Sequence, residues 1–301
     1  MKIRWIILGI FLLSGLSLYP QYGRQYIRAG AGVGMFSFNY KIEGGKSKPK
    51  LGFGVHVDYS YFFSPNWGVG SGLELSMCST NGYLNGTGVS FDNKIDDEGH
   101  LYRKDIYFRD WSEIQTALYL EIPILMHYQY DFGLRKRMIM HLHFGAKVQL
   151  PLTGKYNVTH GDLEVQGYYP EWNVVFFGMP NHGFGSDGGS NMRGELDLPL
   201  NVAATVGFDF LFEISKKVDI FVGASFDYGF SNTKSVNNGD LLYENQYEDL
   251  YYRGIMMSSA IDKANTIAVQ GEFGIRYAIG NQRAGIYDRK SKEKTLSPIN
   301  K

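Results

Sequence analysis

Residues 266–279 alternate between apolar and polar side chains with few exceptions. Ile267, Val269 and Phe273 fall on one face of an extended chain and Gln270 on the other, because successive side chains of a strand point to opposite faces. The same two-faced pattern recurs about eight times along the chain. Segments of this kind, separated by turn residues, are typical of strands that close into a barrel across a membrane. The alternation therefore predicts an all-β chain.

Short and long connections alternate between the predicted strands. In transmembrane barrels, short turns face the periplasm and long loops face outward. We therefore predict an eight-stranded antiparallel up-and-down transmembrane β-barrel with long extracellular loops and both termini periplasmic. The expected strands are residues 25–40, 51–63, 67–79, 114–130, 138–150, 198–213, 219–230 and 266–279. The expected long loops are residues 41–50, 80–113, 151–197 and 231–265.

The start of the chain has the features of an export signal. Lys2 and Arg4 precede an apolar stretch, residues 5–18, of the length found in secretory signal peptides. That stretch is short for a membrane-spanning helix, and no later segment offers about twenty consecutive apolar residues. We expect three parts: a signal peptide (residues 1–20), an outer-membrane β-barrel (21–280) and a short charged periplasmic tail (281–301).

Aromatic residues gather beside the predicted short turns, with Tyr59 and Trp67 at the first, Tyr128 at the second and Phe210 at the third. Such girdles mark the membrane–water interface in transmembrane barrels. A soluble up-and-down barrel would turn its apolar face inward instead, and periodicity alone does not separate the two. The girdles, the export signal and the loop asymmetry favour the cell outer membrane.

The overall charge argues against one class of partner. The chain has 30 basic and 30 acidic residues and no basic stripe, so we expect no nucleic-acid partner. Cys78 is the only cysteine, which excludes an intrachain disulfide. We expect Cys78 to be a small residue packed inside the barrel.

The polar faces of the strands predict the lining of the lumen. If the strands on either side of residues 131–137 pair with their faces matched, Glu121 lies opposite Lys147 and His127 opposite His141. Eight strands leave an interior just wide enough for side chains, so we expect ion pairs to fill the lumen and no open pore. A small passive channel is the alternative. The predicted lumenal polar network comprises Arg28, His56, Glu74, Glu121, His127, His141, Lys147, Asp209, Glu272 and Arg276.

Three histidines raise the question of a metal ion. His141 and His143 point the same way on one strand, and His127 lies across the ladder, so the three imidazoles are potential zinc ligands. Lumenal histidines that hydrogen-bond to neighbouring side chains are commoner, so we predict no metal and no cofactor.

An outer-membrane enzyme acting on lipid A or peptides is a second alternative. Such an enzyme would combine His with Ser or Asp near the outer rim. Residues 151–197 contain these residue types but no nucleophile-and-base motif, so we predict no catalytic residues. The candidate rim residues are His160, Asp162, His182, Ser186 and Asp187.

One stretch resembles a known family. Residues 118–128 (LYLEIPILMHY), the glycine-rich residues 30–34 and the Ser-Pro-Asn turn at 64–66 resemble the PorT-like outer-membrane β-barrel family. Leu-Glu-Ile-Pro is the distinctive part. The resemblance implies a small barrel similar to OmpA and OmpX. It also implies either a role in type IX protein secretion, as for some members, or no assigned activity, as for most.

We expect the function to reside in the surface loops or the periplasmic face, through binding or assembly with partners. The expected partners are outer-membrane lipids and membrane or periplasmic proteins. Exposed aromatic residues at high density are typical of contact surfaces. Alternatively, these segments extend the strands above the membrane and pack on each other, and the sequence leaves both options open. The loop contact candidates are Tyr168, Tyr169, Trp172, Tyr247 and Tyr251.

Overall fold

The computed structural model describes residues 23–132, 138–188, 192–235, 239–245 and 249–279. The predicted signal peptide (1–20), the predicted tail (281–301) and Tyr247 lie outside the described residues. No helix in the described part of the chain is long and apolar enough to cross a membrane.

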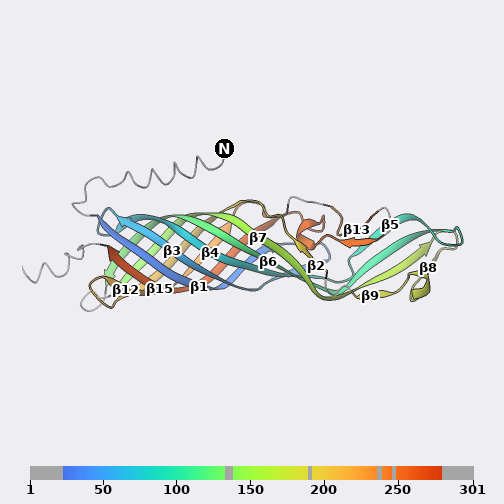
Figure 1. Ribbon diagram of the computed structural model, residues 1–301, viewed down its shortest axis with the longest axis horizontal. Coiled ribbons are helices and arrows are strands. Elements are labelled where there is room, and N and C mark those ends of the chain that lie inside the picture. Colours follow the sequence, from blue (N-terminus) through green and yellow to red (C-terminus); the bar gives the residue numbers. More distant parts are fainter. Residues whose placement is uncertain (1–22, 133–137, 189–191, 236–238, 246–248, 280–301) are drawn as a thin grey trace, which may run out of the picture.

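Eight antiparallel strands close into a barrel, which confirms the predicted fold class (Figure 1). Each strand pairs with its neighbours in the order β7, β11, β12, β15, β1, β3, β4 and β6, and β6 pairs with β7 to complete the circle. The strands are β1 (Arg24–Tyr40), β3 (Leu51–Phe62), β4 (Trp67–Leu84), β6 (Leu101–Phe132), β7 (Met138–Tyr169), β11 (Asn201–Glu213), β12 (Val218–Gly229) and β15 (Ala264–Ile279).

The outer surface of the barrel is an apolar band. On β3, Phe53, Val55 and Val57 are each more than half exposed, whereas Asp58 and Ser60 point inward and are buried. At the end with short turns, the rings of Trp67 and Tyr128 on adjacent strands lie 4.9 Å apart. At the end with long loops, the band finishes with other exposed side chains, namely Leu51, Leu152 and Leu200. We call these two ends the short-turn end and the long-loop end.

The largest departure from the predicted strands concerns β6 and β7. Both continue far beyond the band and pair from Phe132 opposite Met138 to Arg103 opposite Tyr168. Much of the two predicted loops is therefore an extended sheet, which we call the tower (residues 88–110 and 161–188; Figure 1). Charged residues such as Lys104 interrupt the lipid-type alternation there, so the pattern did not predict strands. The tower also contains three short strands that pair with β6 or β7, namely β5 (Gly88–Ile95), β8 (Val174–Phe176) and β9 (Ser186–Gly188), and the short helix η2 (Pro180–His182).

The tower joins the barrel at an irregular point. The register of β6 and β7 shifts between Arg109 and Ser112, where Asp110 has a φ of 46° and Gly161 a φ of 128°. A Cβ atom on Gly161 would lie 2.6 Å from Cα of Trp111, so only glycine fits. The bulge allows the paired strands to change direction as they leave the barrel.

Loops cover the long-loop end of the barrel. The described parts of one of these loops, residues 231–235, 239–245 and 249–263, contain a two-stranded sheet and a helical turn. Their apolar side chains join a core with Phe36 and Phe38 of β1 and Tyr119 of β6. Cys78 is buried in this core. The additional elements are β2 (Gly45–Pro49), β10 (Arg193–Glu195), β13 (Leu242–Glu244), β14 (Leu250–Tyr252) and η3 (Ile255–Met257). The ion pairs thus lie towards the short-turn end, and most of the apolar core lies towards the long-loop end beside buried polar residues such as Gln149, Asn201 and Thr266.

Candidate functional site

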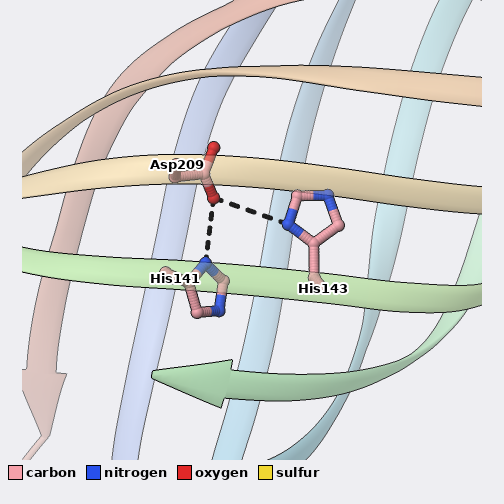
Figure 2. Close-up of side chains that lie close together, drawn as sticks. All are labelled: His141, His143 and Asp209. Carbon is pink, nitrogen blue, oxygen red and sulfur yellow. Dashed lines mark hydrogen bonds and ion pairs between the residues drawn. The ribbon is translucent and has the colours of Figure 1, made fainter. Parts of the chain in front are cut away.

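Asp209 is the centre of the polar interior. It lies directly opposite His141 in the pairing of β11 with β7, and His143 lies opposite Gly207. One carboxylate oxygen, Oδ2, accepts from Arg28 at 2.9 Å, lies 2.9 Å from Nδ1 of His141 and 3.5 Å from Nδ1 of His143 (Figure 2). A Cβ atom on Gly207 would lie 2.1 Å from Nε2 of His143, so the missing side chain makes room for the imidazole.

His127 extends this cluster onto β6. Its Nδ1 lies 3.0 Å from Nε2 of His141, and the two rings stack with centroids 5.1 Å apart. Gly70 on β4 leaves space for His127 in the same manner, since a Cβ atom there would lie 2.4 Å from its Nε2. Histidine side chains therefore fill positions left open by glycine on neighbouring strands.

Lys147 forms a second cluster. Its ammonium group donates to Glu74 at 2.9 Å and to Asp227 at 2.8 Å, and it lies 3.6 Å from Glu121. Glu121 also accepts from Gln149 at 3.1 Å and from Ser76. Side chains from β4, β6, β7 and β12 therefore meet at one lysine.

The predicted register of β6 with β7 is wrong by two residues. Lys147 lies opposite Pro123, and Glu121 lies opposite Gln149. His127 lies opposite His143 rather than His141. Pairing begins at Phe132 with Met138, so the turn is shorter than the alternation suggested. A shift of two keeps every side chain on its face, which is why the expected partners still meet diagonally.

Two arginines complete the ion pairs. Arg28 lies 3.7 Å from Asp58 and 3.8 Å from Glu272, in addition to its bond with Asp209. Arg276 donates to Asp219 at 2.9 Å and to Gln129 at 3.2 Å. Sequence reasoning missed Asp219, although it has the same parity on β12 as the lumenal Asp227.

His56 and a small cavity lie between the two clusters. His56 Nε2 is 3.8 Å from Asp58. The cavity measures about 30 Å³ and is lined in part by Arg28, His56, His143 and Lys147. It has room for one or two water molecules, which would satisfy unpartnered atoms such as His56 Nε2 and Asp58 Oδ1.

Within the described residues, lumenal carboxylates outnumber lumenal cations. Burying unpaired charge is costly, and each cation lies within 4 Å of at least one of these carboxylates. The cations are Arg28, Lys147 and Arg276, and the histidines are His56, His127, His141 and His143. The carboxylates are Asp58, Glu74, Glu121, Asp209, Asp219, Asp227 and Glu272.

His141, His143 and Asp209 have the donor types of a metal site, with one ligand atom of each within 4.8 Å of the others. However, Asp209 Oδ2 already accepts from Arg28, whose guanidinium also lies 3.2 Å from Nδ1 of His141. A divalent ion would have to lie beside this fixed positive charge. The arrangement therefore fits an ion-pair cluster better than a metal centre.

A separate buried carboxylate lies beyond the apolar band. Glu113 accepts from Tyr252 at 2.5 Å, from Gln115 at 2.6 Å and from the backbone N–H of Ile255 at 3.1 Å. Trp111 in turn donates to the Tyr252 hydroxyl at 3.1 Å. Burial raises the pKa of the Glu113 carboxyl, and these hydrogen bonds oppose the increase. The network ties residues 252–255 to the barrel mouth. The only feature of the sequence that pointed to this network was a carboxylate next to the predicted strand at 114–130.

The loop contact candidates differ in exposure. Tyr169 is buried, stacks on Trp172 at 5.2 Å and donates to Asp96, so it supports the surface rather than forming it. Tyr168 is half-buried, with Arg103 over its ring at 5.1 Å. Trp172 and Tyr251 are exposed.

Four of the five candidate rim residues lie near the foot of the tower, and His182 lies apart from them in η2. Asp162 pairs with Gly188, and Asp187 pairs with Leu163. His160 Nδ1 lies 3.4 Å from the Thr159 hydroxyl. His182 ends the exposed helical turn η2, and Ser186 begins β9.

Comparisons with known proteins place the chain in a family. A family model described as outer membrane protein beta-barrel domain matches residues 24–234. No curated protein matches the chain.

Three solved structures are similar to this chain at low identity. OprG from Pseudomonas aeruginosa is 12% identical, with a TM-score of 0.31, 85% of this chain covered and 96% of that chain. Neisserial surface protein A is 10% identical, with a TM-score of 0.29 and coverages of 85% and 95%. Ail, the attachment invasion locus protein of Yersinia pestis, in complex with a heparin analogue, is 12% identical, with a TM-score of 0.25 and coverages of 85% and 99%. At these identities and scores the similarity supports no argument about this chain. Because the family model spans well over half of the sequence, the chain belongs to the outer membrane protein beta-barrel domain family.

Proposed function

We propose that this outer-membrane barrel is a binding protein that contacts its partners with the far end of the tower. In this proposal the long-loop end faces outward and both termini are periplasmic, in keeping with the usual loop asymmetry of such barrels. The observation that carries the proposal is a group of exposed apolar side chains far from the apolar band.

These side chains form what we call the tip patch. Its largest members are Phe177, which is 68% exposed, and Trp172, which is 45% exposed. The His100 and Trp172 rings lie 4.6 Å apart and connect the β5–β6 turn with the segment before β8. Exposed apolar residues in one place mark interaction sites on soluble surfaces. The tip patch comprises Ile95, Leu101, Trp172, Val174, Val175, Phe177 and Met179.

The patch packs on a layer of aromatic rings. Tyr169 contacts Trp172, Phe176 and Phe184 with ring centroids 5.2 to 6.4 Å apart, and Tyr102 stacks on Tyr169 at 5.3 Å. A surface ordered in advance loses less entropy on binding. The aromatic residues of the tower therefore divide into a buried support and an exposed contact surface.

The filled interior favours binding over passive transport. Ion pairs occupy the lumen near the short-turn end, and apolar side chains such as Phe36 and Tyr119 occupy the other half. An assembly role in protein secretion is a narrower form of the proposal, supported by the PorT-like resemblance of residues 118–128. The proposal involves no catalytic step.

The test compares two pairs of exposed aromatic residues. Trp172→Ser with Phe177→Ser removes the centre of the tip patch, and Tyr243→Ser with Tyr251→Ser removes a stacked, exposed pair on β13 and β14. Central aromatic residues often contribute about 2 kcal/mol or more to binding. We expect only the tip variant to lose partners cross-linked on intact cells. Equal cross-linking by both variants and the parent protein would refute the proposal.

A third variant separates binding from catalysis. Replacing His160, His182 and Asp187 together with Ala should leave partner recovery and lipid A composition unchanged. If this variant alters lipid A or peptide processing while the tip variant is silent, the protein is an enzyme.

A further inference from the structure

We propose that the lysine-rich hairpin around β2 binds a phosphate-bearing lipid headgroup of the outer leaflet. The inference rests on the proposed outward orientation of the long loops and names one partner on that side. We call this surface the lysine hairpin, defined by Lys41, Lys46, Lys48 and Lys50.

The lysine hairpin lies directly beyond the apolar band. Pro49 pairs with Thr80 of β4, and the backbone N–H of Lys50 donates to Ser79 at 3.1 Å. The next residue, Leu51, is 73% exposed and belongs to the band. In a membrane-embedded barrel, the position between such a leucine and the aqueous loops is the headgroup level.

The lysines share the outward face of β2. Lys46 lies opposite Tyr83, and the Lys48 ammonium is 5.0 Å from the centre of the Tyr83 ring. Ser47, between them, turns the other way and donates to the carbonyl of Tyr40 at 2.8 Å. Lys46, Lys48 and Lys50 are all exposed, so they are accessible from solvent.

A cleft runs between the end of β1 and β2. Its volume is about 480 Å³, and its lining includes Lys41, Lys46, Lys48 and Tyr40. That volume lies within the range of small-ligand sites. Three ammonium groups around one cleft are complementary to a doubly phosphorylated sugar headgroup.

Nothing on the described surface neutralises these lysines. None of the four forms an ion pair within the described part of the chain, in contrast to Lys94 and Lys104, which both bind Glu244. Glu43 is exposed at the turn of the same hairpin, and Asp262 with Lys263 precedes β15, so the neighbouring charges leave a net positive surface.

The opposite side of the barrel differs at the same level. A second cleft, lined by residues 151–155 and 195–198, combines Lys155 with Glu195 and Asp197. One lysine against two carboxylates leaves this cleft with a net negative charge, so the lysine hairpin is the side that attracts phosphate. A basic residue near an anionic membrane surface gains on the order of 1 kcal/mol, which salt screens.

The experiment measures lipid retained by the full-length barrel. The protein is reconstituted in phosphatidylcholine vesicles that contain a minor fraction of bisphosphorylated lipid A, and bound lipid is counted by native mass spectrometry after extraction. The variant Lys46→Gln with Lys48→Gln and Lys50→Gln should bind lipid A at least about tenfold more weakly than the parent. The control Lys155→Gln should bind as the parent does.

Additional measurements distinguish binding of a lipid headgroup from binding of a free anion or of a protein. Dephosphorylated lipid A should not be retained, and inorganic phosphate should not displace the bound lipid. Equal retention by the triple variant, or equal retention of the phosphate-free lipid, would overturn the proposal. Displacement by inorganic phosphate would reassign the surface to free anions, and selective retention of an acidic protein would reassign it to protein binding.

Two controls separate a loss of lipid binding from misfolding and from a loss of partner binding. Heat-modifiable migration on gels shows that each variant still forms a closed barrel. The tip variant, Trp172→Ser with Phe177→Ser, should keep its lipid, so failure of partner binding and failure of lipid binding are observed separately.

Discussion

Tyr252 donates a 2.5 Å hydrogen bond to Glu113, although 139 residues separate them in the chain. The bond joins the loop over the barrel mouth to β6. Because Glu113 also accepts from the backbone of Ile255 and no cation contacts it among the described residues, its charge governs how firmly this loop is held.

The loop should therefore loosen as pH rises. Burial raises the pKa of Glu113 in the folded protein above its ordinary value of 4.5. For a carboxyl with a raised pKa, the stabilisation is fully present below the ordinary value and is lost as pH rises through the raised value. Amide-exchange protection factors for residues 250–257 should fall over that window in the parent protein. In Glu113→Gln they should stay constant, and an identical pH profile in both proteins would contradict this assignment.

Removing Lys147 should destabilise the barrel strongly. Lys147→Met leaves Glu74, Asp227 and Glu121 facing each other without their shared cation. Breaking a buried ion pair from one side costs about 3–5 kcal/mol. Denaturant unfolding in lipid vesicles measures the loss. Adding Glu74→Gln and Asp227→Asn should restore part of it, and no recovery in the combined variant would show that the lysine acts through packing alone.

The absence of a side chain at Gly207 should contribute to the stability of the folded barrel as much as the side chains around it do. Gly207→Ala places a methyl group where the His143 imidazole lies, which we expect to cost about 1–3 kcal/mol through overpacking. Gly271 on β15 is the matched control, since its nearest neighbour lies 3.8 Å from the added Cβ. The same unfolding assay should show little change for Gly271→Ala. Equal effects would mean that backbone entropy, not the histidine, determines the loss.

The purified barrel should not conduct ions across a lipid bilayer. Ion pairs and the apolar core together fill the interior, so planar-bilayer recordings should show no large, steady current. Sustained porin-like conductance at neutral pH would instead support the passive-channel alternative.

The face of each side chain was predictable from the sequence, whereas the register was not. Alternation depends only on parity, so it placed Glu121, His127 and Lys147 inside the barrel without any knowledge of pairing. Register depends on the turn between β6 and β7, and an error of two residues leaves parity unchanged. The sequence therefore predicted the contact of Glu121 with Lys147, but it predicted it from a strand pairing that the structure does not have.

Other features of the structure have no periodic pattern in the sequence that would predict them. The tower strands carry charged residues on both faces beyond the membrane, so residues 101–113 looked like a loop. The apolar core near the long-loop end depends on Phe36 and Phe38, which lie on the face that is polar elsewhere, and on loop residues such as Ile255. Glu113 acquires its role only when Tyr252 folds back over it, which local sequence does not indicate.

The length of β7 determines what the tip patch can meet. Leu152 closes the apolar band and Tyr169 ends the strand, and at about 3.3 Å per residue this segment spans roughly 55 Å. A phosphate bound at the lysine hairpin would stay at the foot of the tower. Sugar chains attached to such a lipid would surround the shaft, and Trp172 and Phe177 would stand among or above their outer ends. In the proposed orientation, the barrel would thereby present an apolar contact surface to molecules that cannot approach the bilayer itself.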